Sequence, residues 1–486
     1  MLYRSRRPPS QRSDAVDLAA DAGSVAVSTA VPSDEYAGTV VELPRVGPTP
    51  DFTINTLGPC RITSPMAPLL DGRQTTEHYV DERDRVLYDD TLAGINSRGV
   101  PRSELPGMEP CGPRRKIFFD PAKTRAAIVT CGGLCPGLND VIAGLVRSLT
   151  YHYKVRRVIG IRNGYQGFSP RYGHDVVDLT PETVRDIAVD GGTVLGTSRG
   201  HQDPEEIVDC LERLHVNILF VVGGDGSMRG AMQIARVIAE RELLIAVVGI
   251  PKTIDNDIPY IDQSFGFQTA FSHASDAIRA ARVEAKSTAN GVGLVKLMGR
   301  HSGFIACYAA LARSDADVVL IPEVPFALDG ENGLLAHLRR RVEERGHAVV
   351  VVAEGAGQEL LGGHADSDRD ASGNARLHDV GPYLRRRIGD HFSDLGIESS
   401  IRYIDPSYAI RSVPANPYDS VYCVRLSQAA VHAAMSGHTE MVVGRYRRRF
   451  VHIPMGVAVS RRNQVDPMGD LWLAVLESTG QPVRFG

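Results

Sequence analysis

The sequence Val222-Gly223-Gly224-Asp225-Gly226-Ser227 follows an apolar run at 217–221 and precedes a segment with helical spacing. A strand, a glycine turn and a helix start are expected here. Glycines let the backbone approach an anion, and the amides at a helix N-terminus favour negative charge. Phosphate is therefore the natural ligand, although such turns also occur for structural reasons alone. Asp225 would repel a bare phosphate but would suit a magnesium ion that bridges to one.

A second unit of this kind begins at 125–130, where an apolar strand runs into the glycines of 131–140. Asn139 is expected to cap the helix that follows, because its side chain can accept a bond from a free amide. Similar segments alternate along the chain, with strands expected at 155–161, 216–222, 243–250, 292–297, 317–321 and 348–353, and helices at 181–190, 204–214, 228–240, 270–285 and 302–312. Strands that are apolar throughout and alternate with helices predict parallel sheets covered on both faces, with ligands at the carboxyl ends of the strands.

Composition limits the classes of function. The chain has 486 residues, 43% of them hydrophobic and 23% charged, which is typical of a globular protein with two or three domains. A formal net charge of −4 gives no support to a nucleic-acid or membrane partner, and no apolar run is long enough to span a membrane. Seven cysteines without regular spacing favour a reducing compartment, and we expect a cytoplasmic protein. The basic N-terminus lacks the apolar core of a secretory signal, whereas a transit peptide remains open.

After the strand at 243–250 comes the loop Pro251-Lys252-Thr253-Ile254-Asp255-Asn256-Asp257, whose charges beside a buried strand indicate a functional site. With this loop the chain resembles the phosphofructokinase family, most closely its long, plant-like and trypanosomal ATP-dependent branch. The matching elements are TCGGLCPGLN (130–139), LGTSRG (195–200), GGDGS (223–227), PKTIDND (251–257), MGRHSG (298–303), AEG (353–355) and DPSYAIRSVPANPYD (405–419).

The expected fold class is α/β, with two doubly wound parallel-sheet (Rossmann-like) domains and an N-terminal extension. We expect a disordered arm at 1–50, an extension that wraps the core at 51–115, a nucleotide-binding domain at 116–257, a sugar-phosphate-binding domain at 258–446, and a C-terminal segment at 447–486 that packs back on the core. The polar stretch 362–373 is expected to be a solvated loop rather than a metal site.

The resemblance implies transfer of the γ-phosphoryl group of MgATP to the 1-hydroxyl of fructose 6-phosphate. An alcohol needs a base to take its proton, and Asp255 matches the family's base, while Asp257 could orient the loop or the metal. Arg199 and Arg300 match arginines near the transferred phosphate. Asp225 matches the magnesium-site aspartate. The positions that match the nucleotide site are Gly133, Arg199, Gly200, Gly224, Asp225, Gly226 and Ser227.

The sugar phosphate requires its own donors, and the matching positions are Thr253, Ile254, Asp255, Met298, Gly299, Arg300, Glu354, Arg402, Tyr408 and Arg411. Guanidinium groups suit a phosphate dianion. In shorter relatives the arginine that matches Arg402 comes from a neighbouring subunit, so a homodimer or homotetramer is implied. Gly291 stands where those relatives carry a second intersubunit arginine. Tyr165 matches a residue near the adenine, but core packing is an equally good explanation of it.

Two positions bear on the phosphoryl donor. Pyrophosphate-dependent relatives typically carry aspartate at the position of Gly226, where its side chain would fill the space of the α-phosphate of ATP. Lys252 favours pyrophosphate as the donor, because short ATP-dependent enzymes typically carry glycine there and pyrophosphate-dependent enzymes carry lysine. The long ATP-dependent branch combines this glycine with this lysine, so we expect ATP. A pyrophosphate-dependent phosphotransferase is the alternative.

Two functions of other classes also have to be considered. A non-catalytic sugar-phosphate-binding homologue would keep the fold without the chemistry, but Asp225, Asp255, Arg199 and Arg300 are all present. A kinase of NAD or of a lipid would share the GGDG turn. It would not explain the loop at 251–257 or the element at 405–419.

Overall fold

A computed structural model describes residues 49–67, 78–101, 104–362 and 376–486. Residues 50–486 form one compact unit. The expected disordered arm at 1–50 lies outside the described residues except for its last two positions. The expected loop at 362–373 also lies outside them, except for Gly362. Among the helices that are described, none is both long and apolar enough to cross a membrane.

The larger sheet has seven strands in the order β17-β16-β10-β9-β6-β7-β8. Their bounds are β6 Arg125–Thr130, β7 Arg157–Ile161, β8 Val177–Asp178, β9 Ile218–Gly223, β10 Ala246–Pro251, β16 Met441–Tyr446 and β17 Arg449–Pro454. The inner pairs are parallel, whereas β8 and β17 pair antiparallel at the two edges. Two strands from the C-terminal part of the chain thus complete a sheet that its first half begins.

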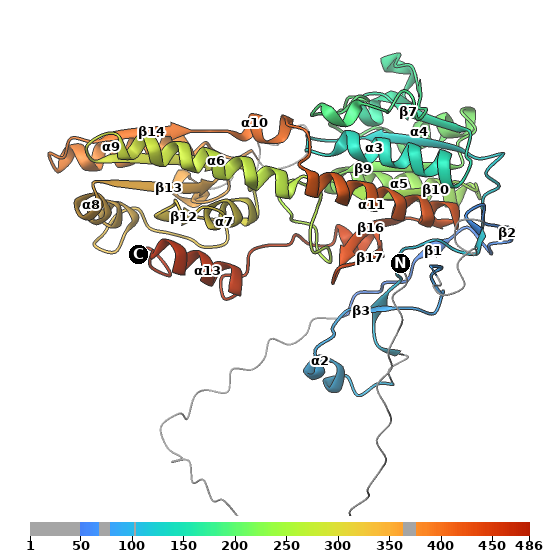
Figure 1. The fold of residues 1–486 in the computed structure, drawn as a ribbon, viewed down its shortest axis with the longest axis horizontal. Helices are drawn as coiled ribbons and strands as arrows, with labels where there is room; N and C mark the ends of the chain where they lie inside the picture. The colour runs from blue at the N-terminus through green and yellow to red at the C-terminus, as the bar shows by residue number, and fades with distance from the viewer. Residues whose placement is uncertain (1–48, 68–77, 102–103, 363–375) are drawn as a thin grey trace, which may run out of the picture. The chain divides into compact units, whose positions relative to one another are not determined.

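Helices cover both faces of this sheet (Figure 1). Helices α3 (Leu138–Arg147) and α11 (Pro417–Met435) pack on one face, and α4 (Pro204–Arg213), α5 (Asp225–Glu240) and α12 (Met455–Ala458) pack on the other. Successive residues of β6 contact opposite cores, since Ile128 lies with α3 and Val129 with α5. This is why residues 126–129 of the strand are all apolar.

The smaller sheet has the order β12-β13-β11-β14 and is parallel throughout. Its strands are β11 Gly291–Leu297, β12 Val318–Leu320, β13 His347–Ala353 and β14 Ser400–Ile404. One face is covered by α6 (Phe267–Lys286), α7 (Phe304–Leu311) and α13 (Asp470–Thr479), and the other by α8 (Leu334–Arg345) and α9 (Val380–Asp394). The short helix α10 (Ser407–Ser412) follows β14. The observed fold is the expected α/β class with two sheet-based domains.

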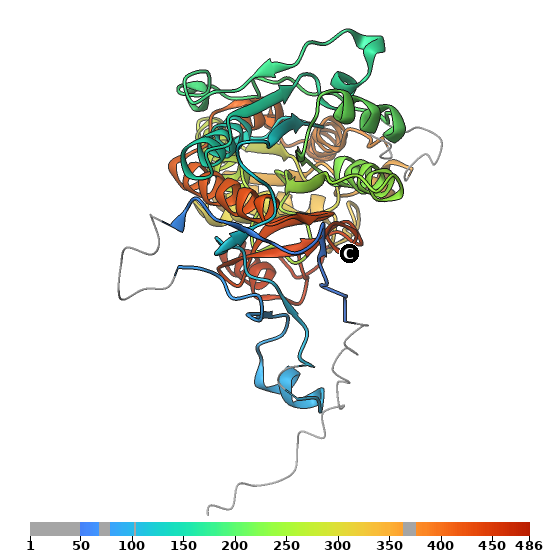
Figure 2. The same ribbon diagram turned by 90° about the vertical axis from the view of Figure 1, so that its right-hand side faces the viewer.

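The N-terminal extension consists of short elements and contacts β17 at the edge of the larger sheet (Figure 2). Strand β1 (Asn55–Thr56) pairs with β15 (His438–Thr439). Within the extension, β2 (Ile62–Thr63) pairs with β5 (Lys116–Ile117), and β3 (Val86–Leu87) pairs with β4 (Gly107–Met108). The helix α2 (Leu92–Ser97) lies between β3 and β4 in the sequence. Backbone bonds from Cys111 to Phe450 and from His452 to Glu109 add to this attachment.

Two local expectations are wrong. Residues 181–190 form turns and one 3-10 helix, Ile187–Val189, because the hydroxyls of Thr180 and Thr183 bond nearby backbone and compete with helical bonds. Asn139 does not cap α3, which begins after Gly137. Its buried amide instead donates to Ile187 and Asp190 oxygens and accepts from the Val194 amide, and so fixes the loop that precedes Arg199.

The domain boundaries stay a prediction, because residues 50–486 are grouped in one unit. Strand pairing nevertheless assigns residues 441–454 to the larger sheet, although the boundary expected at 446 falls inside β16. The expected series ends at residue 353 and therefore lacks the helices α9, α11 and α13 and the strands β14, β16 and β17. It also lacks α8, which lies before that residue.

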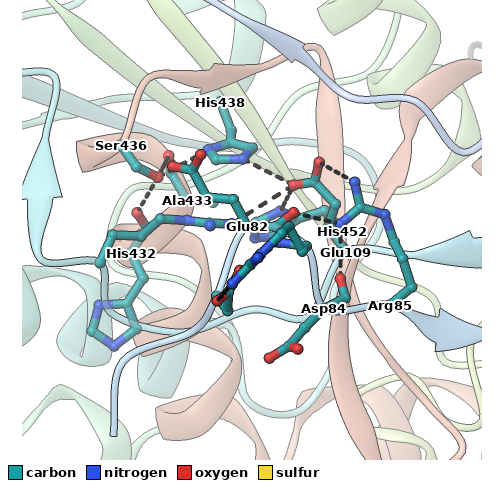
Figure 3. A network of polar contacts seen from close by, with 12 residues as sticks. Glu82, Asp84, Arg85, Glu109, His432, Ala433, Ser436, His438 and His452 are labelled. Carbon is teal, nitrogen blue, oxygen red and sulfur yellow. Dashed lines mark hydrogen bonds and ion pairs between the residues drawn. The ribbon is translucent and has the colours of Figure 1, made fainter. Parts of the chain in front are cut away.

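A buried polar cluster joins the extension to the sheet edge (Figure 3). Oε2 of Glu109 lies 3.1 Å from His438 Nε2 and 3.4 Å from His452 Nδ1. Arg114 and Arg85 lie 3.7 Å from its two carboxylate oxygens. Burial opposes ionisation of Glu109, but the hydrogen bonds from His438 and His452 outweigh it and hold the pKa of Glu109 well below its usual range. The carboxylate is thus the shared partner of the cluster.

We predict that Glu109→Gln lowers the free energy of unfolding by about 2–3 kcal/mol at pH 7.5, because it leaves two imidazoles and a buried guanidinium without their carboxylate. Urea unfolding with Glu104→Gln, at an exposed glutamate of the same segment, as the control would measure this. A carboxyl with a lowered pKa stabilises the fold above its ordinary pKa of 4.5, so the difference between Glu109→Gln and the parent should shrink only below that pH. Equal midpoints at pH 7.5 would contradict the prediction.

Candidate active site

The glycine turn lies where β9 ends and α5 begins. Helix α5 starts at Asp225 after Gly224, and no side chain caps its first amides. A Cβ atom added at Gly226 would have no atom within 4 Å, whereas one at Gly223 would lie 2.3 Å from Cβ of Ser227. Gly223 is therefore required by packing, and Gly226 borders open space. Free amides beside open space are suited to a phosphate group.

The loop at 252–257 lies beside this turn because β10 pairs with β9 in parallel register, with Pro251 opposite Gly223. The Lys252 amide donates to the Gly223 carbonyl at 2.9 Å. The Lys252 side chain is buried, and its Nζ would lie 3.3 Å from a Cβ added at Gly132. Burial lowers the pKa of this lysine. The loops after β6, β9 and β10 therefore meet at one edge of the sheet.

Asp255 lies in this loop, and the surroundings of its carboxyl group favour proton binding. Its Oδ1 atom is buried and has no hydrogen-bond partner among the described residues. Burial, and then the neighbouring carboxylates of Asp257 and Glu354, raise the pKa of Asp255 to about 8, against the opposing effect of Arg462 and Arg300. A carboxylate with a pKa near the working pH and an unused oxygen has the properties of a general base.

Asp225 and Asp257 share one cationic partner. Nη2 of Arg462 lies 3.2 Å from Oδ2 of Asp225, and its Nη1 donates to Oδ2 of Asp257. The Thr253 hydroxyl donates to the other oxygen of Asp257 at 2.5 Å. Burial raises the pKa of Asp225, and Arg462 opposes this. Two carboxylates that converge on one positive group offer the hard oxygen ligands that magnesium prefers, so the donor set at Asp225 fits such an ion.

The loop at 195–200 brings Arg199 to the first glycine loop. Thr197 donates its hydroxyl to the Gly132 carbonyl at 2.7 Å, and the Gly132 amide donates to Ser198 at 3.1 Å. A terminal nitrogen of Arg199 would lie 3.5 Å from a Cβ added at Gly133. A guanidinium group thus faces the edge where the phosphates are expected, and Gly200 follows it with a φ of +100°.

The smaller sheet contributes the ends of β11 and β13. These strands are parallel, with Leu297 opposite Ala353, and the Glu354 amide donates to Leu297 at 2.8 Å. Met298, Gly299 and Arg300 therefore lie beside Glu354. Burial raises the pKa of Glu354, and the nearby Arg300 has the opposite effect on this pKa. The Ser302 hydroxyl lies 3.4 Å from the Asp255 carbonyl, and Ile254 packs against core residues of both sheets.

Two expected sugar-phosphate residues, Arg402 and Tyr408, are more exposed than the rest of the set. Arg402, on β14, is half-exposed and lies 3.6 Å from Glu284 of α6. Tyr408 is exposed, and the guanidinium of Arg411 lies 4.6 Å from the centre of its ring. Arg411 is near enough to Glu354 to lower its pKa, as a minor cause after burial. Arg402 thus pairs with a carboxylate that is not among the expected site residues.

Sequence reasoning missed Arg462 and did not settle the position of Tyr165. Arg462 follows Arg461 in a basic stretch, and neither spacing nor glycine context separates it from ordinary surface charge. Tyr165 is buried and donates its hydroxyl to the Ser227 carbonyl at 2.6 Å, which favours a packing role.

Comparison with known proteins identifies the family of this chain. A family model described as phosphofructokinase matches residues 125–434. An ATP-dependent 6-phosphofructokinase from Amycolatopsis methanolica is 58% identical over 441 residues, which cover 90% of this chain and 96% of that protein. The ATP-dependent 6-phosphofructokinase of Borreliella burgdorferi is 46% identical over 441 residues, with 90% and 98% covered. ATP-dependent 6-phosphofructokinase 7 of Arabidopsis thaliana is 50% identical over 376 residues, 77% of each chain.

Among solved structures, a pyrophosphate-dependent phosphofructokinase from Marinobacter aquaeolei has the same fold. Its TM-score is 0.60 at 20% identity, and the match covers 75% of this chain and 92% of that one. The family model spans more than half of the residues, and the curated relatives match over most of their length. The chain belongs to the phosphofructokinase family.

Proposed function

We propose that the chain is an ATP-dependent 6-phosphofructokinase, which transfers the γ-phosphoryl group of MgATP to the 1-hydroxyl of fructose 6-phosphate. The main observation in its favour is Asp255, whose buried Oδ1 atom has no hydrogen-bond partner among the described residues, beside a helix N-terminus that borders open space. Relatives that are 46–58% identical carry that name over most of the chain. The seven unpaired thiols fit a cytoplasmic enzyme.

In this mechanism Asp255 accepts the proton of the 1-hydroxyl as the oxygen attacks. The free amides at the start of α5 hold the phosphates of the nucleotide. Arg199 and Arg300 supply positive charge on two sides of the transferred group, whose charge spreads over its oxygens. Asp225 would hold a magnesium ion, which would neutralise part of the phosphate charge when bound.

The donor is assigned to ATP because of Gly226. The space beside its Cα is open, and an aspartate side chain there would put a carboxylate where a nucleotide α-phosphate has to lie. Lys252 is buried against the first glycine loop and is compatible with either donor. A pyrophosphate-dependent phosphotransferase is the second candidate, and Lys252 is the residue that favours it.

The enzyme is proposed to be a homo-oligomer, a dimer or a tetramer, in which Arg402 completes the sugar-phosphate site of a neighbour. Arg402 is half-exposed on β14, the last strand of the smaller sheet. No other strand pairs with its outer side within the described residues. An open sheet edge that carries an exposed arginine suits a contact between subunits.

The first test offers Mg2+ and fructose 6-phosphate with either ATP or pyrophosphate and measures fructose 1,6-bisphosphate. We expect product with ATP alone, and none when a chelator removes the metal. Product with pyrophosphate would favour the second candidate, and product with neither donor would favour a non-catalytic homologue.

Gly226→Asp should reduce ATP-dependent turnover at least about tenfold more than any pyrophosphate-dependent turnover, because the new carboxylate would fill the space of the α-phosphate. Equal losses with both donors would contradict this steric argument.

We predict that Asp255→Ser lowers kcat by about 10²–10⁴-fold, because the attacking hydroxyl loses its base, while fructose 6-phosphate still binds. Steady-state kinetics would give kcat, and calorimetry would give the dissociation constant of the sugar phosphate. Asp262→Asn, at an exposed aspartate a few residues on, is the matched control. Unchanged turnover of Asp255→Ser would remove Asp255 from this role.

We predict that Arg402→Ala raises the KM for fructose 6-phosphate by about 10–100-fold, as expected for the loss of a charged hydrogen bond to phosphate. If Arg402 serves a neighbouring subunit, refolded mixtures of Arg402→Ala and Asp255→Ser chains will regain activity, since some sites then contain both native residues. Mixtures no more active than the separate variants would show that Arg402 acts within its own chain.

A further inference from the structure

The segment 459–466, between α12 and α13, is fixed by contacts with loops of both sheets. Figure 1 shows the chain passing from β17 to α13 along this path. The bonds are Arg229 Nη2 to the Val459 carbonyl (3.2 Å), the Asn463 amide to the Asp257 carbonyl (2.7 Å), Gln464 Nε2 to the His301 carbonyl (2.9 Å) and the Val465 amide to Glu323 Oε1 (2.8 Å). The backbone on both sides of Arg462 is therefore held in place.

From this position Arg462 bridges two carboxylates of the site. Its Nη2 lies 3.2 Å from Asp225 Oδ2, and its Nη1 donates to Asp257 Oδ2. The side chains of Asp225 and Asp257 are only 16% and 6% exposed. Buried carboxylates are stable when a cation pairs with them, and the guanidinium fork can serve two at once.

We propose that Arg462 is a positioning residue of the phosphoryl-transfer site: it holds Asp225 and Asp257 together in the free protein and releases Asp225 when a divalent metal binds there. This rests on the proposed function, in which Asp225 holds magnesium. The oxygen that Arg462 contacts, Oδ2, is a natural metal ligand, and a metal ion and a guanidinium on one carboxylate repel each other. Arg462 and the metal are thus competitors for Asp225.

The two carboxylates differ in how much they depend on Arg462. Asp257 also accepts the Thr253 hydroxyl at 2.5 Å and belongs to a loop held by Asn463. Within the described part of the chain, Asp225 has one ion pair, with Arg462. Exchange of Arg462 for a metal at Asp225 therefore leaves the contact with Asp257, and with it the position of the loop that carries Asp255.

The test measures Mn2+ binding by the nucleotide-free protein with electron paramagnetic resonance, since Mn2+ takes the same oxygen ligands as magnesium. We expect Arg462→Gln to bind Mn2+ at least about fivefold more tightly than the parent, because a competing charge has gone. Arg462→Lys should fall between the two. The matched control is Arg461→Gln, since Arg461 lies 5.3 Å from the ring centre of Tyr260, and it should bind as the parent does.

A second readout separates positioning from general stability. Arg462→Gln should lower kcat at least tenfold at saturating substrates while the KM for fructose 6-phosphate changes little, and Arg462→Lys should restore part of kcat. Mn2+ binding by Arg462→Gln that is no tighter than in the parent overturns the proposal. If the thermal midpoint shows that Arg462→Gln does not fold, Mn2+ binding by Arg462→Lys is compared with that of the parent instead, and binding no tighter than in the parent overturns the proposal. The metal measurement needs no substrate, so a parent without kinase activity would count against the proposed function and leave this test valid.

Discussion

The parallel pairing of β9 with β10 is the constraint on which the site depends. Pro251 lies opposite Gly223, and the Lys252 amide donates to the Gly223 carbonyl at 2.9 Å. Both strands therefore end at the same level, where the amides of α5 face the loop that carries Asp255. A slip of one residue would turn every side chain of the strand to the opposite face. Both strands are fully buried, so such a slip would also break the core.

The site concentrates carboxylates, and its chemistry follows from how their charge is balanced. Asp225 and Asp257 are paired with Arg462, and Glu354 lies near Arg300. Among the described residues Oδ1 of Asp255 has no hydrogen-bond partner, and burial, followed by the carboxylates of Asp257 and Glu354, raises the pKa of Asp255 to about 8. The arrangement thus leaves one carboxyl free to take a proton. The others lie beside cations from separate parts of the chain.

The strands around the site could be predicted because the central positions of β6, β9, β10, β11 and β13 are largely apolar and because glycine or charged residues follow soon after them. The loops that follow them contain most of the candidate residues. The stretch at 181–190 was mispredicted because side-chain hydroxyls and Asn139 take its backbone groups, and apolar spacing does not register such bonds. The identity of the base and of the metal ligand came from the family resemblance, and their roles stay predictions.

Arg462 lies beyond what a linear sequence reveals, since its partners precede it by more than two hundred positions. It reaches them because β16 pairs with β10 and β17 pairs with β16, which returns the C-terminal part of the chain to the larger sheet. From β17 the chain crosses to α13 (Figure 1), and on the way the Asn463 amide donates to the Asp257 carbonyl. The charge balance of the site is therefore complete only when the last strands of the chain are in place, and the C-terminal segment is part of the site rather than a cover over it.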